Sequence, residues 1–202
     1  MSAWVKVCGI TDPAVAAAAV DAGVDALGFV VVPGSPRAVT PEQAEALIGG
    51  VEVSTFVVTV DAEAARVVEL ATAVGASGIQ PHGRYAAEAA REASAAGFEV
   101  LFPVPVRDAP PDLGDVPPAA IPLLDRFDPT IHGGSGRTFD WRLVRRSGRR
   151  FVLAGGLGPD NVRRAIAMVA PWGVDASSRL ESAPGRKDTA KVVAFIEEAK
   201  RP

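Results

Sequence analysis

The only cysteine of the chain, Cys8, follows a short apolar run in the segment Lys6-Val7-Cys8-Gly9-Ile10. Residues 5–7 have the β-branched character of a strand, and Asp12 followed by Pro13 is typical of a helix start. A thiol at the end of a strand is a candidate base, because a nearby positive charge lowers its pKa and raises its thiolate fraction. A buried thiol with a purely structural role is the commoner case, so position alone leaves both interpretations open.

A carboxylate, Asp125, follows another apolar run at residues 120–124. Packing does not require a carboxylate there, and partial desolvation would raise its pKa until it could act as a general acid. Asp125 could equally cap a helix or pair with Arg126 or Arg137. The sequence thus offers a candidate acid and a candidate base, each at the end of a strand.

Residue types that bind anions follow other apolar runs. Arg37 lies in a loop stiffened by two prolines, and a guanidinium group matches a carboxylate in a bidentate manner. The Gly- or Ser-rich stretches 133–136, 154–157 and 177–178 suit phosphate, because their backbone N–H groups can approach an anion closely. A solvated loop arginine and ordinary turn glycines are the simpler readings.

The two histidines do not suggest a metal site. His82, which follows Gln80 by two positions, could contact a substrate, but a hydrogen-bonding role within the protein is the preferred reading. Neither His82 nor His132 belongs to an H-x-x-x-H pattern, and the chain has no C-x-x-C. No metal is therefore expected.

Eight short apolar runs alternate with Ala-rich helical patterns along the chain. The expected strands are residues 5–7, 26–32, 53–60, 78–81, 99–106, 120–124, 151–154 and 173–176. The expected helices are residues 13–22, 41–48, 62–74, 85–96, 141–146, 159–169 and 187–200. Strands that alternate with helices pair in parallel through right-handed crossovers, and eight such units close best as a barrel.

The predicted fold is therefore α/β: a single (β/α)₈ TIM barrel domain over residues 1–202, with eight parallel strands. Four prolines within residues 107–118 predict that a loop replaces or shortens the fifth helix. An open doubly wound sheet is the alternative, but its G-x-G-x-x-G fingerprint after the first strand is missing. In a barrel, the active site lies at the C-terminal ends of the strands.

Composition points to a small cytoplasmic protein. The chain has 202 residues, 48% of them hydrophobic, and a net charge of −3, so no basic field favours nucleic acid or anionic lipid. One cysteine excludes an intrachain disulfide framework and agrees with a reducing compartment. No signal core and no apolar run of membrane-spanning length is evident, so no membrane association is expected.

Several motifs occur in an order that resembles one known family. They are Lys6-Val7-Cys8-Gly9-Ile10-Thr11, Ser35-Pro36-Arg37, Gln80-Pro81-His82-Gly83, Leu123-Leu124-Asp125, Gly133-Gly134-Ser135-Gly136-Arg137-Thr138-Phe139-Asp140-Trp141, Leu153-Ala154-Gly155-Gly156-Leu157, Gly173-Val174-Asp175-Ala176-Ser177-Ser178 and Pro184-Gly185-Arg186-Lys187-Asp188. Together they resemble the phosphoribosylanthranilate isomerase family of tryptophan biosynthesis over nearly the whole chain.

The resemblance implies a barrel without a cofactor that performs an Amadori rearrangement of N-(5-phosphoribosyl)anthranilate to the 1-deoxyribulose phosphate product. It implies that Asp125 is the general acid, that Cys8 is the general base and that Arg37 holds the anthranilate carboxylate. The other substrate-binding residues that it implies are Gly155, Gly156, Ser177 and Ser178 for phosphate, Gly134, Ser135 and Gly136 in a loop that closes over the substrate, and Gln80, His82 and Asp175.

Two departures from the family pattern stand out. Pro81 replaces an aliphatic residue and removes a backbone donor, so the fourth strand is expected to end early. Arg179 follows the two serines where the family often has glycine, and it could strengthen phosphate binding or crowd the loop.

Two alternative functions remain open from the sequence. One is the related histidine-pathway phosphosugar isomerase, whose barrel has an aspartate at the place of Cys8. The other is a catalytically silent barrel that binds a phosphorylated ligand. The expected partner is a small phosphosugar, and a monomer is expected rather than a homodimer.

Overall fold

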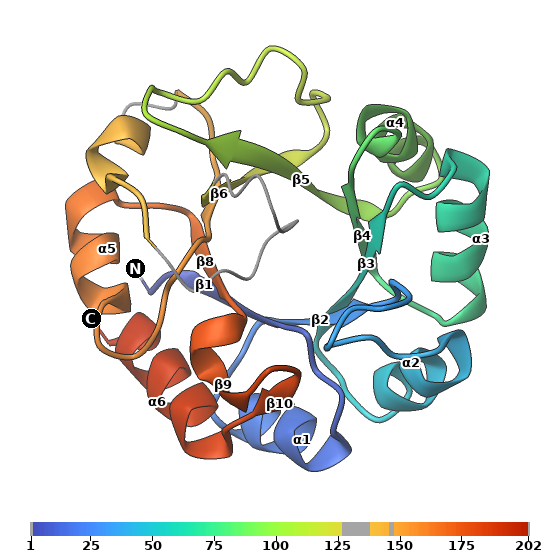
Figure 1. The fold of residues 1–202 in the computed structure, drawn as a ribbon, viewed down its shortest axis with the longest axis horizontal. Helices are drawn as coiled ribbons and strands as arrows, with labels where there is room; N and C mark the ends of the chain where they lie inside the picture. The colour runs from blue at the N-terminus through green and yellow to red at the C-terminus, as the bar shows by residue number, and fades with distance from the viewer. Residues whose placement is uncertain (1, 127–137, 146–147, 202) are drawn as a thin grey trace.

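A computed structural model describes residues 2–126, 138–145 and 148–201 of the chain. Eight parallel strands form a closed barrel in chain order, as the sequence predicts, and Figure 1 shows the helices in a ring around it. The strands are β1 (Trp4–Cys8), β2 (Ala26–Val30), β3 (Ser54–Val60), β4 (Gly78–His82), β5 (Glu99–Val106), β6 (Ile121–Arg126), β7 (Val152–Leu153) and β8 (Gly173–Ala176). The barrel closes where Lys6 of β1 pairs with Asp175 of β8 on one side and Ala26 of β2 on the other.

Six α-helices are described, and side-chain caps fix the start of three of them. The helices are α1 (Pro13–Asp21), α2 (Pro41–Ile48), α3 (Ala64–Ala73), α4 (Ala86–Ala95), α5 (Val162–Val169) and α6 (Thr189–Lys200). Asp12 accepts a hydrogen bond from the N–H of Ala14 at the start of α1, Thr40 and Gln43 form a capping box at α2, and Asp188 caps α6. These caps end each preceding loop at a defined residue.

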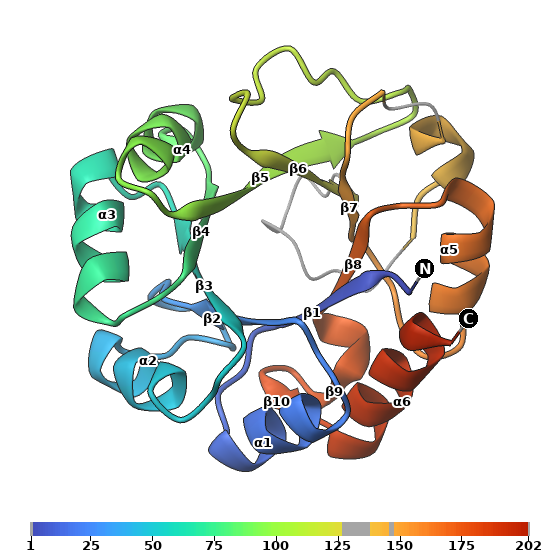
Figure 2. The same ribbon diagram turned by 180° about the vertical axis from the view of Figure 1, so that it is seen from behind.

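The connection between β5 and β6 contains no helix, as its prolines predict. Residues 107–120, all of which the structure describes, form a loop on the outside of the barrel (Figure 2). In Figure 2 this loop lies outside β5 and β6, between α4 and the gold helical turn of residues 141–144. The guanidinium of Arg149 donates to the carbonyl oxygens of Val116 and Ala120, so the loop is held although it has no helical hydrogen bonds.

The fourth strand does not end early, contrary to the expectation drawn from Pro81. β4 stays in register with β3 as far as the pair Val60–His82, whereas its pairing with β5 stops at Ile79. Alternate residues of a parallel strand direct their backbone groups to opposite neighbours. The N–H of Asp61 donates to the carbonyl of His82, so His82 is bonded on the β3 side and the missing donor of Pro81 faces the side where pairing has already stopped.

Other differences lie in the second half of the chain. The predicted helix 141–146 is a short 3-10 helix, η1 (Trp141–Val144). After β8 the chain forms a 3-10 turn, η2 (Ser178–Leu180), and a hairpin of β9 (Glu181–Ala183) and β10 (Arg186–Lys187), none of which the sequence predicted. The final helix therefore begins at Thr189 and not at residue 187.

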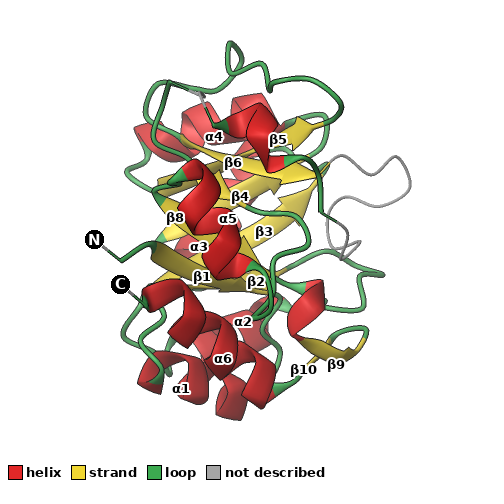
Figure 3. Cartoon of the chain, turned by 90° about the vertical axis from the view of Figure 1, so that its left-hand side faces the viewer, coloured by secondary structure: helices red, strands yellow, loops and turns green. Residues whose placement is uncertain are grey.

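Side chains fill the barrel interior and pack the helices against the strands. Inside the barrel a small apolar cluster consists of Ala26, Phe56, Leu101, Leu123, Val152 and Ala154. Because side chains alternate along a strand, Trp4, Lys6 and Cys8 all face this interior. Figure 3 shows that both chain termini lie at the end of the barrel away from the β9–β10 hairpin. None of the described helices is long and apolar enough to cross a membrane.

Candidate active site

The C-terminal ends of the strands bring the candidate acid and base to one end of the barrel. Cys8 is the last residue of β1, Asp125 is the fifth of the six residues of β6, and Ser177 follows β8 directly. All eight strands are parallel, so these residues lie at the same rim, and the β9–β10 hairpin lies beside it.

A buried lysine, Lys6, lies beside Cys8 at the base of the site. Its side chain is fully buried, and its Nζ atom donates to Gln80 Oε1 at 2.9 Å and to Asp175 Oδ1 at 3.0 Å. β4 is not a neighbour of β1, so the bond to Gln80 crosses the barrel interior. A Cβ atom on Gly28 would lie 2.8 Å from Cys8 Sγ and 3.2 Å from Lys6 Cε, so both side chains rest against the glycine backbone of β2.

Charge and burial compete at Cys8. Burial raises the pKa of the Cys8 thiol, Lys6 and Lys187 oppose this increase, and Asp175 reinforces it. Burial also disfavours the charged form of Lys6, but Asp175 and Cys8 outweigh it and raise the pKa of the ammonium group. The result is a neutral thiol at neutral pH with a permanent cation next to it, which is positioned to stabilise the thiolate once it forms.

Asp125 has an environment that keeps it protonated far above its usual range. Burial, reinforced by the negative charge of Asp175, raises its pKa from 3.8 to about 7, although the N–H of Arg126 donates to Oδ1 at 2.7 Å and Lys6 lowers it. A Cβ atom on Gly155 would lie only 2.9 Å from that same Oδ1. The Asp125 carboxyl group therefore borders the Gly155-Gly156 turn, and it can donate a proton near neutral pH.

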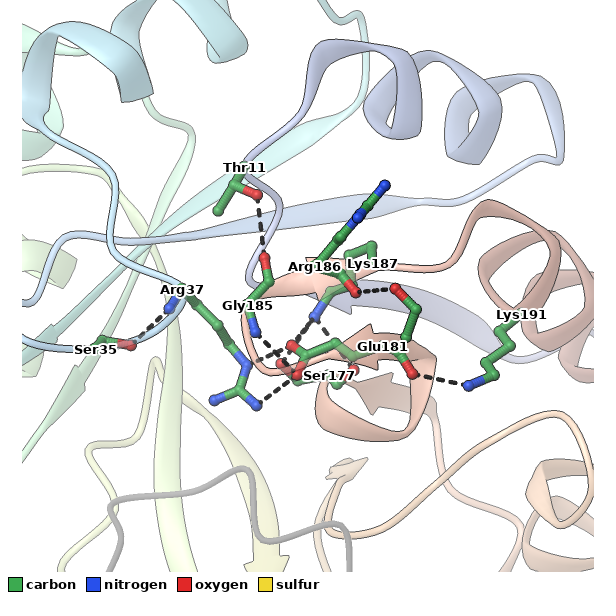
Figure 4. A network of polar contacts seen from close by, with 10 residues as sticks. Thr11, Ser35, Arg37, Ser177, Glu181, Gly185, Arg186, Lys187 and Lys191 are labelled. Atoms are coloured by element: carbon green, nitrogen blue, oxygen red, sulfur yellow. Dashed lines mark hydrogen bonds and ion pairs between the residues drawn. The ribbon is translucent and has the colours of Figure 1, made fainter.

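Arg37 reaches the site across the backbone of Gly9. A Cβ atom on Gly9, whose φ is +77°, would lie 2.7 Å from Arg37 Cδ and 3.2 Å from Ser177 Oγ. Arg37 is not free, because its Nε and Nη2 atoms donate to the two carboxylate oxygens of Glu181 at 2.6 and 3.0 Å. Figure 4 shows this pair beside the β9–β10 hairpin. Arg37 thus lies next to Gly9 and close to Ser177, the first of the two serines that are predicted to bind phosphate.

The glycines and serines predicted for phosphate lie in two adjacent loops. Gly155 and Gly156 both have left-handed φ values, +86° and +66°, which other residue types rarely adopt. Ser177 and Ser178 are half-buried after β8, and Lys187 Nζ donates to the Ser177 carbonyl at 3.2 Å and to Oγ at 3.3 Å. Backbone N–H groups in such turns, with a lysine nearby, are suited to an anion.

Arg179 links these two loops. Its Nη1 donates to the Gly156 carbonyl at 3.3 Å, and its Nη2 donates to both carboxylate oxygens of Asp160 at 2.8 Å. Asn161 supports the same turn by donating to the Gly156 carbonyl and accepting from the N–H of Gly158, each at 2.9 Å. The residue that departs from the family pattern therefore ties the β8 loop to the β7 loop.

Gln80 and His82 both face the site from β4. Gln80 is buried, His82 is half-buried, and Gln80 Nε2 lies 3.0 Å from His82 Nε2. Gly134, Ser135 and Gly136 lie outside the described residues. Within the described ranges, no group of three or more His, Cys, Asp or Glu residues is arranged to hold a metal ion.

Sequence reasoning missed three charged residues of the site: Lys6, Glu181 and Lys187. Lys6 carried a usable signal, because a lysine two positions before Cys8 in an apolar strand must share its inward face. Lys187 stands in the motif of residues 184–188 but was given no role there, and Glu181 looks like an ordinary surface charge until the hairpin brings the two together at 2.9 Å.

Comparisons with known proteins show similarity to one enzyme family over nearly the whole chain. The family model for N-(5'phosphoribosyl)anthranilate (PRA) isomerase matches residues 5–198. The N-(5'-phosphoribosyl)anthranilate isomerase of Pelobacter propionicus is 42% identical, over 97% of this chain and 95% of its own. A crystal structure of monomers of the dimeric phosphoribosylanthranilate isomerase of Thermotoga maritima has a TM-score of 0.82 and 35% identity over 98% of both chains. Another phosphoribosyl anthranilate isomerase, in complex with reduced 1-(o-carboxyphenylamino)-1-deoxyribulose 5-phosphate, has a TM-score of 0.81 and 35% identity over 98% of both chains.

Proposed function

The chain belongs to the N-(5'-phosphoribosyl)anthranilate isomerase family, and we propose that Asp125 and Cys8 carry the two proton transfers of its reaction. The activity is an intramolecular redox isomerisation in tryptophan biosynthesis, in which an aldose amine becomes a ketose amine. The observation that carries the assignment is the pairing of Asp125 with Cys8 at one rim of the barrel. Burial raises the pKa of Asp125 to about 7, and the buried Lys6 lies beside the Cys8 thiol.

Asp125 acts first, as the general acid. Its carboxyl group protonates the furanose ring oxygen while the bond from that oxygen to C1 breaks. The anthranilate nitrogen donates its lone pair to C1, so the open sugar is a protonated Schiff base. A carboxyl group with a pKa near 7 is suited to this step, because it is protonated in a large fraction of molecules at neutral pH yet gives up its proton readily.

Cys8 acts second, as the general base. The Cys8 thiol first loses its proton to solvent, and the thiolate then removes the proton from C2 and becomes a thiol again. The electrons of that C–H bond form the C1–C2 double bond, and the nitrogen becomes neutral. The product is an enolamine, which tautomerises to the ketone. Burial raises the pKa of Cys8 in the protein alone, but the cationic Schiff base adds a positive charge to that of Lys6 and favours the thiolate at this moment.

The other site residues hold the two anionic ends of the substrate. In this proposal Arg37 binds the anthranilate carboxylate, and the backbone around Gly155, Gly156, Ser177 and Ser178 binds the phosphate. Lys187 adds a positive charge near the phosphate end, where it already bonds to Ser177. The remaining polar residues, Gln80, His82 and Asp175, face the sugar between these ends. Gly134, Ser135 and Gly136, which lie outside the described residues, are proposed to bind the substrate as well.

Three broader features are part of the proposal. Residues 1–202 form one domain, because the strands of a single closed barrel extend from Trp4 to Ala176 and α6 packs back on β1. The enzyme is proposed to act as a monomer, because the acid, the base and the described anion-binding residues of a single chain already lie at one rim of its barrel. It works in the cytoplasm, where a reducing environment keeps Cys8 as the thiol that the mechanism needs.

The test is an isomerase assay on freshly generated phosphoribosylanthranilate, followed through the loss of its anthranilate fluorescence. Wild-type protein should turn over, and Cys8→Ala and Asp125→Ala should each lower kcat by about 10²–10⁴-fold, because each removes one proton transfer. Circular dichroism confirms that each variant is folded. Folded wild-type protein without turnover would contradict the proposed function, and full activity in either variant would contradict that residue's role.

A further inference from the structure

A buried carboxylate, Glu181, holds two cations at the rim of the site. It begins the β9–β10 hairpin, and its side chain is only 5% exposed. Its oxygens accept from Arg37 Nε at 2.6 Å and Nη2 at 3.0 Å, from Lys187 Nζ at 2.9 Å and from the N–H of Gly185 at 3.3 Å. Burial disfavours its charge, but the bonds from Arg37 and Lys187 outweigh that effect and lower the pKa of Glu181. Glu181 is therefore an anion at neutral pH.

The contact with Glu181 uses only one edge of the Arg37 guanidinium. Nε and Nη2 form the side edge, which is bidentate to the Glu181 carboxylate. A guanidinium has five N–H groups in a rigid plane, so the end edge, made of Nη1 and the second N–H of Nη2, keeps a fork that fits another carboxylate. Fixing the side edge also fixes the direction in which the end edge points.

The loop and the hairpin that hold this pair are themselves locked together. A Cβ atom on Gly185 would lie 1.9 Å from the carbonyl oxygen of Pro36, the residue before Arg37. Thr11 Oγ1 donates to the Gly185 carbonyl at 3.4 Å, and the stem of Arg37 lies against Gly9. Figure 4 shows Glu181, Gly185 and Lys187 of the hairpin facing Arg37. The position of the guanidinium is therefore set by two chain segments that are about 140 residues apart.

We infer that Glu181 is a positioning residue that aims the free edge of Arg37 and thereby selects substrates whose aromatic ring carries a carboxylate. This inference rests on the role proposed above for Arg37. Glu181 does not touch the substrate. It acts through Arg37, and it limits the excess positive charge of Arg37 and Lys187 to one unit beside the site.

Two stable probes distinguish a role of Glu181 in carboxylate recognition from a role in the fold or at the phosphate end. The first is the product reduced at its ketone, which keeps the carboxylate on its ring. The second is the same compound made from aniline, which lacks that carboxylate. Dissociation constants for both probes are measured by calorimetry on the full chain, for wild type, Glu181→Gln, Arg37→Ala and the double variant. Glu69→Gln is the matched control, because it removes a glutamate charge from an exposed pair with Arg66.

We expect Glu181→Gln to raise the dissociation constant of the carboxylate probe about ten- to thirty-fold, the usual effect of losing a charge-assisted hydrogen bond. The dissociation constant of the carboxyl-free probe should change by less than about three-fold, and Glu69→Gln should leave the dissociation constants of both probes unchanged. In turnover, Glu181→Gln should raise KM by a similar factor and leave kcat within about three-fold. The double variant should bind the carboxylate probe no more weakly than Arg37→Ala, because Glu181 acts only through Arg37.

Three results would overturn the inference. Equal weakening of both probes by Glu181→Gln would mean that Glu181 supports the fold or the phosphate end. Tighter binding of the carboxylate probe would mean that Glu181 competes with the substrate. If Arg37→Ala weakens both probes equally, the proposed role of Arg37 fails first and the inference fails with it. If Glu181→Gln does not fold, Glu181→Asp carries the same test, because it keeps the charge but is too short for the bidentate contact.

Discussion

At the scale of single residues, burial raises the pKa values of both Asp125 and Cys8. Asp125 becomes an acid that is matched to neutral pH, whereas Cys8 stays a thiol until a positive charge arrives. Lys6 supplies a permanent charge for that purpose from the same face of β1. The strand therefore carries the proposed base and, two positions away, a cation that lowers the pKa of its thiol.

A first prediction concerns the stability cost of Asp125. Its folded pKa of about 7 is above its ordinary value of 3.8, so this group's contribution to stability is fully present below pH 3.8 and is lost as the pH rises to about 7. Asp125→Asn removes the buried charge, and it should stabilise the protein at pH 8 by about 1–3 kcal/mol while lowering kcat by about 10²–10⁴-fold. Urea unfolding at pH 8 and pH 4 measures this. The gain should be absent at pH 4, and a loss of stability at pH 8 would contradict the burial argument.

A second prediction concerns Lys6. Lys6→Met keeps the length of the side chain but removes the positive charge that lowers the pKa of Cys8, so the thiolate should form less readily. Alkylation of Cys8 by iodoacetamide at pH 8 should be slower, and kcat should fall by about 10²-fold. Lys200→Met, at an ion pair with Asp25 away from the site, is the control. Alkylation as fast as in the wild type, in a folded variant, would show that Lys6 does not tune Cys8.

At the scale of elements, the strands could be predicted because their signals are local. Runs such as residues 99–106 and 173–176 have the same bounds in the structure as in the prediction, since β-branched runs and helix caps act within a few residues. The β9–β10 hairpin was not predicted although Pro184-Gly185 is a turn signal, because its strands of three and two residues are too short to show a strand pattern. Arg37 was predicted as a substrate-binding residue, but its partner Glu181 was not, because the two are 144 positions apart in the sequence.

A third prediction tests the packing of Gly185 against Pro36. Gly185 and Gly97 both have left-handed φ values, +80° and +90°, but a Cβ atom at Gly97 would meet nothing within 4 Å. Both Gly→Ala changes should cost about 1 kcal/mol for backbone strain. Gly185→Ala should cost roughly 2 kcal/mol more, because it forces the hairpin away from Pro36, and it should also raise KM. Urea unfolding and steady-state kinetics measure both effects, and equal costs at the two glycines would contradict the proposed docking of the hairpin.

At the scale of the whole molecule, the barrel provides a rigid frame for a site assembled from its strand ends and loops. Lys6 of β1, Gln80 of β4 and Asp175 of β8 bond across the interior above the apolar cluster that fills it. The barrel interior is therefore filled by apolar side chains in one layer and by hydrogen-bonded charged side chains in the layer next to the site. This arrangement explains why the reacting groups can be buried without weakening the barrel beneath them.

A fourth prediction concerns assembly. Among the described residues Met168 is the single large hydrophobic side chain that is exposed, so no apolar face of the size that a stable dimer needs is evident in those ranges. Light scattering coupled to size exclusion should give the mass of one chain, 20.9 kDa, and urea unfolding should give one transition by fluorescence and circular dichroism. Twice that mass at micromolar concentration would contradict the monomer, and two transitions would contradict the single domain.

The pH dependence of kcat/KM reports the protonation states of Asp125 and Cys8 in the reaction. The reacting form needs Asp125 protonated, with a pKa of about 7, and Cys8 as the thiolate, with a pKa raised by burial. The logarithm of kcat/KM should therefore rise with pH to about 7 and then stay level, until the thiol itself titrates. In Asp125→Asn the break near pH 7 should disappear. A rate that falls directly above pH 7 would show that the thiolate of Cys8 is not needed, and a rate that rises through pH 7 without a break would show that Asp125 is not the acid.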